Sequence, residues 1–205
     1  MKTKLCFALF LVCTITFCQS ASEILKKVQN KFNSINNFTA DFTQNYFNAQ
    51  GQNAGKMEGK FSYKRKNKFI VDLKNQFIVS DGQTIWNNDS RFNRVVISKL
   101  NDDPTSFSLE RFIFEYPPQC KITAAKDENY LKQNVIELTP KEQNMQFKSA
   151  KIWIDSDGMI DKMEIIDAGG MRYAFQFTEI KINQDLPDSK FSFSPAKGTK
   201  IIDLR

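Results

Sequence analysis

Apolar residues recur at helical spacing at the start of the folded part of this chain. Their steps of one, three and four residues place them on one face, with lysine and asparagine on the other. These apolar positions are Ile24, Leu25, Val28, Phe32 and Ile35. Ser22 is expected to cap the helix, and Asn36-Asn37 to end it. The pattern predicts an amphipathic N-terminal helix.

After this helix the period of the pattern changes to two, which indicates β-strands. Apolar and polar residues alternate from Phe38 to Thr43. The further candidate strands are Gly55–Arg65, Lys68–Leu73, Gln76–Ser80, Thr84–Asn88, Phe92–Ser98, Asn134–Thr139, Ala150–Asp155, Ile160–Asp167 and Arg172–Ile182. Turn residues such as Lys66-Asn67 and Asp81-Gly82 separate them. Strands joined by turns, without intervening helices, predict an antiparallel meander in a single domain.

One apolar segment interrupts the strands. Asp103-Pro104-Thr105-Ser106 is a helix-start signal, and Pro117-Pro118 ends the segment. The apolar residues between them are Phe107, Leu109, Phe112, Ile113 and Phe114. A short helix is expected here. It either plugs one end of a barrel or covers a cavity as a lid, and periodicity does not separate these two interpretations.

The strands gather apolar side chains on one face. Phe61 shares a face with Tyr63, Phe69 with Val71 and Leu73, and Tyr173 with Phe175 and Phe177. A sheet of about ten strands with one apolar face, together with two apolar helices, predicts a mainly β protein with a curved or nearly closed barrel. In a small barrel these rings would fill the core. In a half-open barrel they would line a cavity for an apolar ligand.

The amino-acid composition limits the kinds of catalytic and metal-binding site that the chain can form. The 205 residues include 19 Phe and no His, which removes the commonest general base and the His-ligated metal sites. The acidic residues fall mainly in turns or on helix faces; they are Glu110, Glu115, Asp155, Asp157, Asp161 and Asp167. Asp155–Gly158 lacks the later ligands of a calcium loop, and no glycine-rich phosphate loop is present. We therefore expect a protein that is not an enzyme and needs no cofactor or metal.

The first 20 residues have the pattern of a secretory signal peptide. Met1–Lys4 is basic, Leu5–Phe17 carries no charge, and small residues stand at Cys18 and Ser20, before a cleavage site expected at Ala21. The alternative is a lipoprotein signal acylated at Cys18, where the bulky side chain before the cysteine is unfavourable. Residues 1–20 are thus expected to be the signal peptide, and residues 21–205 a single exported domain.

The charge of the expected mature chain does not indicate nucleic-acid binding. It retains 27 basic and 23 acidic residues, a net charge of +4. One basic cluster stands out, formed by Lys56, Lys60, Lys64, Arg65, Lys66 and Lys68. It is either a solvated face or a positive rim for an acidic partner or anionic lipid. Cys120, the only cysteine of the expected domain, is interpreted as a small buried residue.

Three motifs resemble one known family, in the family's order. They are Asn37–Gln44, the hairpin Val79–Trp86 and the C-terminal stretch Phe191–Asp203. The chain resembles the LolA family, the periplasmic carriers of outer-membrane lipoproteins in Gram-negative bacteria, from about Ala21 to Asp203. The resemblance implies a half-open antiparallel β-barrel of about eleven strands. Its hydrophobic cavity would be covered by the N-terminal helix and a central lid helix.

The resemblance also implies a function. An inner-membrane ABC-type complex would load the acyl chains of a lipoprotein into the cavity, and the carrier, expected to be a monomer, would deliver them across the periplasm to an outer-membrane acceptor. Arg65 corresponds to the arginine that latches the family's lid. The expected cavity residues are Phe42, Phe61, Tyr63, Phe69, Val71, Leu73, Trp86, Phe175 and Phe177, and the expected lid residues are Phe107, Leu109, Phe112 and Ile113.

This sequence departs from the family pattern at three positions. Lys66 and Val71 stand where the family often has Pro and Trp, and Ala196 replaces a second Pro. Two other non-enzymatic roles of the same fold stay open: a sensor or regulatory module, and a lipid-anchored outer-membrane acceptor. A lipid hydrolase is the enzymatic alternative, and the missing histidine argues against it.

Overall fold

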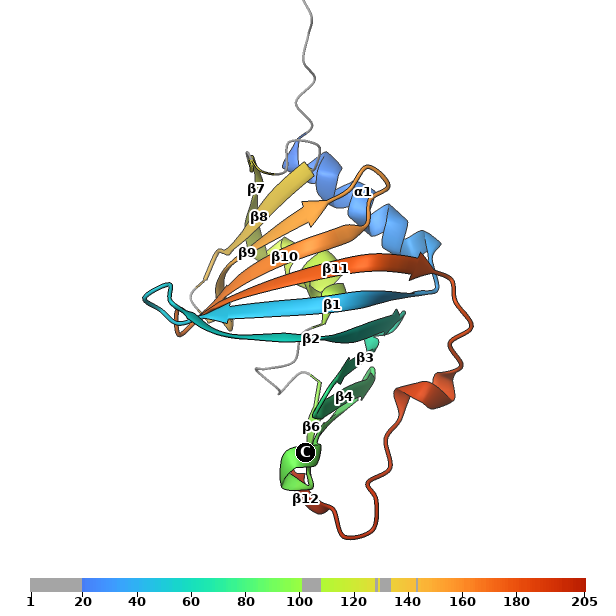
Figure 1. Cartoon of the computed structure of the whole chain (residues 1–205). Helices are drawn as coiled ribbons and strands as arrows, with labels where there is room; N and C mark the ends of the chain where they lie inside the picture. Colours follow the sequence, from blue (N-terminus) through green and yellow to red (C-terminus); the bar gives the residue numbers. More distant parts are fainter. Residues whose placement is uncertain (1–19, 101–107, 128, 130–133, 143) are drawn as a thin grey trace, which may run out of the picture.

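The computed structural model describes residues 20–100, 108–127, 129, 134–142 and 144–205. One helix, α1 (Ala21–Ser34), precedes a sheet of twelve strands (Figure 1). The first six strands are β1 (Asn37–Phe47), β2 (Asn53–Lys64), β3 (Lys68–Leu73), β4 (Gln76–Asp81), β5 (Thr84–Asp89) and β6 (Arg94–Lys99). The others are β7 (Cys120–Ala125), β8 (Asn134–Pro140), β9 (Phe147–Ile154), β10 (Ile160–Asp167), β11 (Arg172–Ile182) and β12 (Lys200–Asp203).

The sheet is one open, mostly antiparallel layer. Its strand order is β12-β6-β5-β4-β3-β2-β1-β11-β10-β9-β8-β7, so β12 and β7 are its two ends. The long strands β1 and β11 pair in the middle and join the half containing β2–β6 to the half containing β7–β10. Only β12 is parallel to its neighbour, β6, among the described pairs. The expected half-open, mainly antiparallel β fold is confirmed, with twelve strands in place of about eleven.

Helix α1 is capped two residues earlier than expected. The Ser20 hydroxyl accepts a hydrogen bond from the Glu23 amide at 3.2 Å, and the Glu23 carboxylate accepts one from the Ser20 amide at 2.8 Å. This reciprocal pair is a capping box, so the expected cap at Ser22 was wrong. The carboxylate of Glu23 has a pKa below its ordinary value because the Ser20 amide and hydroxyl donate to it.

Most strand boundaries follow the period-two pattern. The expected ranges of β3, β10 and β11 match the observed ones. Strand β6 begins at Arg94 because Ser90–Phe92 form a 3₁₀ turn, η1, which Asn93 ends with a φ of 43°. Two strands were missed. β7 is short and weakly alternating, and β12 is mostly exposed and forms through pairing with β6.

The hydrophobic core lies between one face of the sheet and two covering elements. We call this the inner face, and the covers are α1 and the central segment, Ser108–Tyr116. The central segment contains the π-helical turn η2 (Arg111–Glu115), followed by the 3₁₀ turn η3 (Pro117–Gln119). Figure 1 shows α1 crossing one side of the upper half of the sheet. Cys120 is buried at the edge of this core, as expected.

A second cover lies on the outer face of the lower half. After β11, the chain runs back beside β3 and β4 to reach β12 (Figure 1). This C-terminal segment, residues 184–199, contains the 3₁₀ turn η5 (Asp188–Phe191) and buries Phe191. The Phe193 ring packs against the Phe77 ring at 6.0 Å between centroids. Among the described residues, no helix has both the length and the apolar character needed to cross a membrane.

Candidate functional site

Aromatic rings from three neighbouring strands form a continuous cluster on the inner face. Phe42 of β1 contacts Phe61 of β2 and Phe175 and Phe177 of β11, with ring centroids 5.8–6.1 Å apart. Phe61 and Phe177 lie 5.1 Å apart. The pairing of β1 between β2 and β11 brings these rings together, although more than 110 positions separate Phe61 from Phe175.

A second group of rings continues the cluster beneath α1. Phe32 of the helix packs edge-on against Phe38 at 6.1 Å and Tyr63 at 5.6 Å. Sequence analysis placed Phe32 and Phe38 on apolar faces but did not include them in the site. On β3, Phe69 and Val71 are buried in the same cluster, and Leu73 is half-buried against it. Eight of the nine expected cavity residues therefore share the inner face.

Trp86 is the exception, and its expected position was wrong. Ile85 is the residue of β5 that joins the inner cluster, so the adjacent Trp86 points to the outer face. There it pairs across the sheet with Val79 of β4 and Ile97 of β6. Both residues are buried outside the inner cluster.

The central segment covers the inner face with three of the expected lid residues. Leu109, Phe112 and Ile113 are buried in the inner cluster, and the Phe112 ring lies 5.3 Å from that of Phe147. Phe107, the fourth, lies outside the described residues. The expected helix is a short turn of π type, closed by the Tyr116 amide donating to the Arg111 carbonyl at 2.7 Å.

Arg65 binds the end of α1, not the central segment. Its Nε donates to the Ile35 carbonyl at 2.6 Å, and its Nη2 donates to the Asn33 carbonyl. The last carbonyls of a helix have no partner within the helix, so a forked donor suits them. The resemblance implied that Arg65 latches the central lid segment. Its described side-chain hydrogen bonds go to the N-terminal helix instead, so that expectation was wrong.

The central segment is bound by a different residue, Glu110. The Tyr63 hydroxyl donates to its Oε1 at 2.6 Å, and the amides of the β2–β3 turn (Arg65–Asn67) donate to both oxygens. Burial and the Glu110 carboxylate raise the pKa of Tyr63 well above its ordinary value. Glu110 was one of the acidic residues expected in turns or on helix faces. Its position among the apolar lid residues was the available signal.

A surface pocket of about 340 Å³ marks the seam between the two covers and the β2–β3 turn. Its lining comes from α1, the turn and the central segment: Phe32, Asn33, Arg65, Lys66, Glu110, Phe114 and Glu115. Apolar rings and the polar groups that hold the covers meet at this seam. A larger hollow of about 540 Å³ lies along the exposed polar side of α1.

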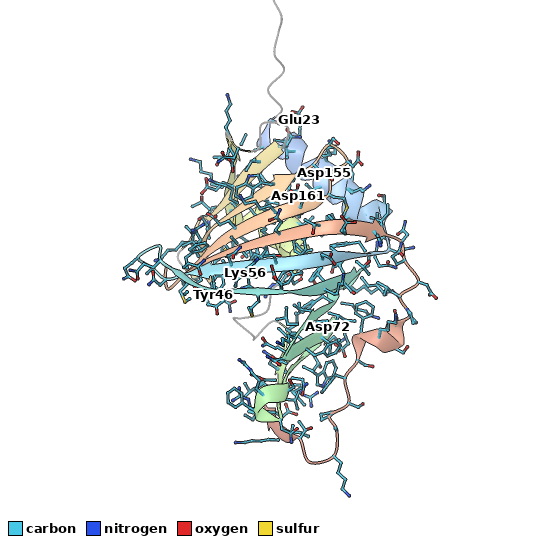
Figure 2. All side chains as sticks on the ribbon, viewed as in Figure 1. Glu23, Tyr46, Lys56, Asp72, Asp155 and Asp161 are labelled. Atoms are coloured by element: carbon cyan, nitrogen blue, oxygen red, sulfur yellow. The ribbon has the colours of Figure 1, made fainter. Side chains whose placement is uncertain are left out.

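The charged residues do not assemble into a metal-binding cluster in the described part of the chain. No group of three His, Cys, Asp or Glu there could hold a metal ion. Asp72 lies in the lower half of Figure 2, and Asp155 and Asp161 lie in the upper half. The Asp155 carboxylate accepts the amides of Asp157 and Met159 at 2.8 and 2.9 Å, which is a turn-forming role.

The basic cluster is divided among separate partners. Lys56 pairs with Glu58, and Lys60 with Asp41. Lys64 and Lys68 bind Asp188 of the C-terminal segment at 2.6 and 2.7 Å. Four of its six members thus form ion pairs along the sheet, which favours the interpretation as a solvated face.

Comparison with known proteins agrees with this geometry. The sequence model of the family "Outer membrane lipoprotein carrier protein LolA" matches residues 33–194, which is most of the chain. The chain belongs to the LolA family. The resemblance seen in the three motifs is therefore confirmed.

Individual LolA relatives match over nearly their full length. The outer-membrane lipoprotein carrier protein of Actinobacillus succinogenes is 28% identical, covering 90% of this chain and 88% of its own. That of Francisella tularensis is 25% identical, covering 98% and 97%. A solved structure of a conserved protein from Thermus thermophilus shares the fold at a TM-score of 0.55 and 15% identity, covering 89% of this chain and 98% of its own.

Proposed function

We propose that the protein is a periplasmic carrier that binds the acyl chains of outer-membrane lipoproteins on its inner face. The observation that carries this proposal is the continuous aromatic cluster of Phe42, Phe61, Phe175 and Phe177, covered by α1 and the central segment. The relatives in Actinobacillus and Francisella carry the name of outer-membrane lipoprotein carriers.

Burial of hydrocarbon supplies the affinity. An acyl chain gains about 0.8 kcal/mol for each CH₂ removed from water. Phenylalanine rings offer large apolar area without polar groups that would need partners. Because the rings contact one another in this closed state, an acyl chain has to displace α1 or the central segment to reach them.

Transfer needs no covalent chemistry. In the proposed cycle, the signal peptide directs export and an inner-membrane ABC-type complex loads the acyl chains. An outer-membrane acceptor then competes for them with its own apolar site. A carrier of this kind must bind strongly enough to keep the chains from water and weakly enough to release them.

Site-specific crosslinking tests the proposal. The photoreactive residue p-benzoylphenylalanine would replace Phe175 on the inner face or, as a matched control, Trp86 on the outer face. We expect a tripalmitoylated cysteinyl peptide to crosslink at position 175 and not at 86, and the same peptide without acyl chains to crosslink at neither. Equal capture of the unacylated peptide would overturn the proposal and favour a protein-binding module.

A further inference from the structure

We infer that Glu110 is a second latch, which holds the central segment closed independently of the bond between Arg65 and α1. Its use in cargo binding rests on the proposed function. The evidence for the latch itself is local geometry at the β2–β3 turn.

The Glu110 carboxylate occupies a preformed binding site for an anion. Lys66 and Asn67 have φ angles of 69° and 57°, so two successive residues are left-handed. Successive amides in such a turn converge on a negative group. The Lys66 amide donates to Oε1 at 3.0 Å, the Asn67 amide donates to Oε2, and the Tyr63 hydroxyl adds a third donor at 2.6 Å.

Neighbouring groups fix the turn in this conformation. Gly82 of the β4–β5 turn packs so tightly that a β-carbon there would overlap the Lys66 carbonyl oxygen. The packing of Gly82 thus lets the sheet aim the two amides at Glu110, and the carboxylate meets donors that need little rearrangement. The buried Ser108 hydroxyl of the central segment adds a further bond to this turn, donating to the Asn67 side-chain oxygen at 2.6 Å.

The same turn binds the two covers through different groups. Arg65 uses its side chain on the carbonyls of α1, whereas Lys66 and Asn67 use backbone amides on Glu110. These bonds meet at the 340 Å³ seam pocket. When the central segment moves away, water can solvate both the Glu110 carboxylate and the turn amides. Opening therefore leaves no buried charge without a partner. Because its charged hydrogen bonds lie at a seam that water can reach, this latch is reversible.

The experiment compares Glu110→Gln with Glu115→Gln by amide hydrogen exchange. Glu115 is the matched control because it lies one helical turn further. Its carboxylate receives a 3.4 Å bond from the Asn67 side chain and pairs at 3.4 Å with Arg111 of its own segment. We expect residues 109–116 of the Glu110→Gln variant to exchange about tenfold faster, as when one hydrogen bond to a charged group is lost. Exchange in α1 should stay unchanged, and the Glu115→Gln variant should match the parent protein.

Two further variants keep the test decisive. Tyr63→Phe removes one donor and keeps the ring, so it should accelerate the same residues by a smaller factor. Arg65→Leu should accelerate the last turn of α1 and leave residues 109–116 protected. Unchanged exchange of residues 109–116 in both the Glu110→Gln and Tyr63→Phe variants would overturn the latch.

Binding of the tripalmitoylated peptide, measured on the same variants, separates the latch from the proposed function. Faster exchange together with altered peptide binding supports both. Faster exchange, with no peptide bound by parent or variant, overturns the carrier function and supports the latch.

Discussion

Gly82 contributes to the latch without touching it. Its φ of 98° is in the left-handed region, and its missing side chain leaves room for the Lys66 carbonyl. The conformation of one turn therefore depends on a single residue in another. Figure 1 shows why this is possible: β2, β3 and β4 lie next to one another in the lower half of the sheet.

Gly82→Ala should destabilise the protein more than Gly198→Ala. Gly198 has a similar φ of 88°, but no atom lies within 4 Å of the place where its β-carbon would stand. Its variant therefore bears only the left-handed strain, about 1–2 kcal/mol. The clash at Gly82 should add about 1–3 kcal/mol. Urea denaturation of both variants measures the difference. Equal losses would show that the turn can shift away from the new methyl group.

At the scale of elements, the central segment differs from the strands it covers. Its η2 turn is a single π-helical turn followed by two prolines, whereas β1 and β11 each have eleven residues and pair along most of their length. The segment is bound mainly by side chains, so it can separate from the inner face while the sheet keeps its hydrogen bonds.

Phe112→Ala should therefore destabilise the fold less than Phe177→Ala. A phenylalanine locked in a core loses about 3–5 kcal/mol on truncation, which we expect for Phe177. For Phe112 the loss of stability cannot exceed the free energy of closing the central segment, because beyond that value the segment opens while the rest of the fold stays intact. We therefore expect a loss of less than about 2 kcal/mol for Phe112→Ala. Urea denaturation gives both values. Cargo binding should fall in both variants.

The same prediction has a second readout in the parent protein. Amides of residues 109–116 should exchange faster than those of Tyr173–Phe177 on β11. Equal protection of the two regions would indicate a fixed plug and contradict a moving cover.

The sequence pattern identified the inward-facing residues well where one face of the sheet is covered and less well where both are. On β1 and β2, alternation identified the inner residues because Thr39, Ser62 and their neighbours are polar. On β4 to β6 part of the outer face is also buried, including Val79 and Ile97, and the C-terminal segment packs on it through Phe193 against Phe77. Apolar residues then occur in succession, as in Ile85-Trp86, and periodicity no longer tells which residue points inward. Trp86 was misplaced for this reason.

The latch residues were unpredictable for a different reason. Arg65 was found through a family motif, but the partner of its side chain depends on where the end of α1 packs. Glu110 binds a turn more than 40 positions away in sequence, through backbone amides that any residue carries. Sequence spacing does not identify such a partner. The available signal was the position of Glu110 among the apolar lid residues, and it does not say what the carboxylate binds.

At the scale of the whole molecule, the two faces of the sheet are covered by different means. The two inner covers both form hydrogen bonds with the β2–β3 turn, whereas the C-terminal segment joins the end of β11 to β12, at the far end of the sheet. Asp188 anchors this segment by binding Lys64 of β2 and Lys68 of β3, and Lys64 also donates to the Leu186 carbonyl at 2.7 Å. Asp188 is thus the charged anchor of the outer cover, beside the apolar contacts of Phe191 and Phe193.

Acid should weaken this anchor over a defined range of pH. Lys64 and Lys68 lower the pKa of Asp188 to about 2, below its ordinary value of 3.8. A group whose pKa is depressed in the folded state stabilises the fold above its unfolded pKa, and that contribution is lost as the pH falls through the folded value. The anchor should therefore act fully at neutral pH, weaken below about pH 4 and be lost as the pH falls through about 2.

Asp188→Asn tests this through the dependence of the melting temperature on pH. The variant should melt below the parent protein at pH 7, and the two melting temperatures should converge as the pH approaches 2, because the parent then loses the same charge. Asp203→Asn is the matched control: its pKa is also about 2, but its partner Arg205 lies only two residues away. Loss of that local pair should leave the docking of residues 184–199 unchanged. A gap between Asp188→Asn and the parent that is equally large at pH 7 and pH 2 would contradict an electrostatic anchor and assign the docking to Phe191 and its apolar neighbours.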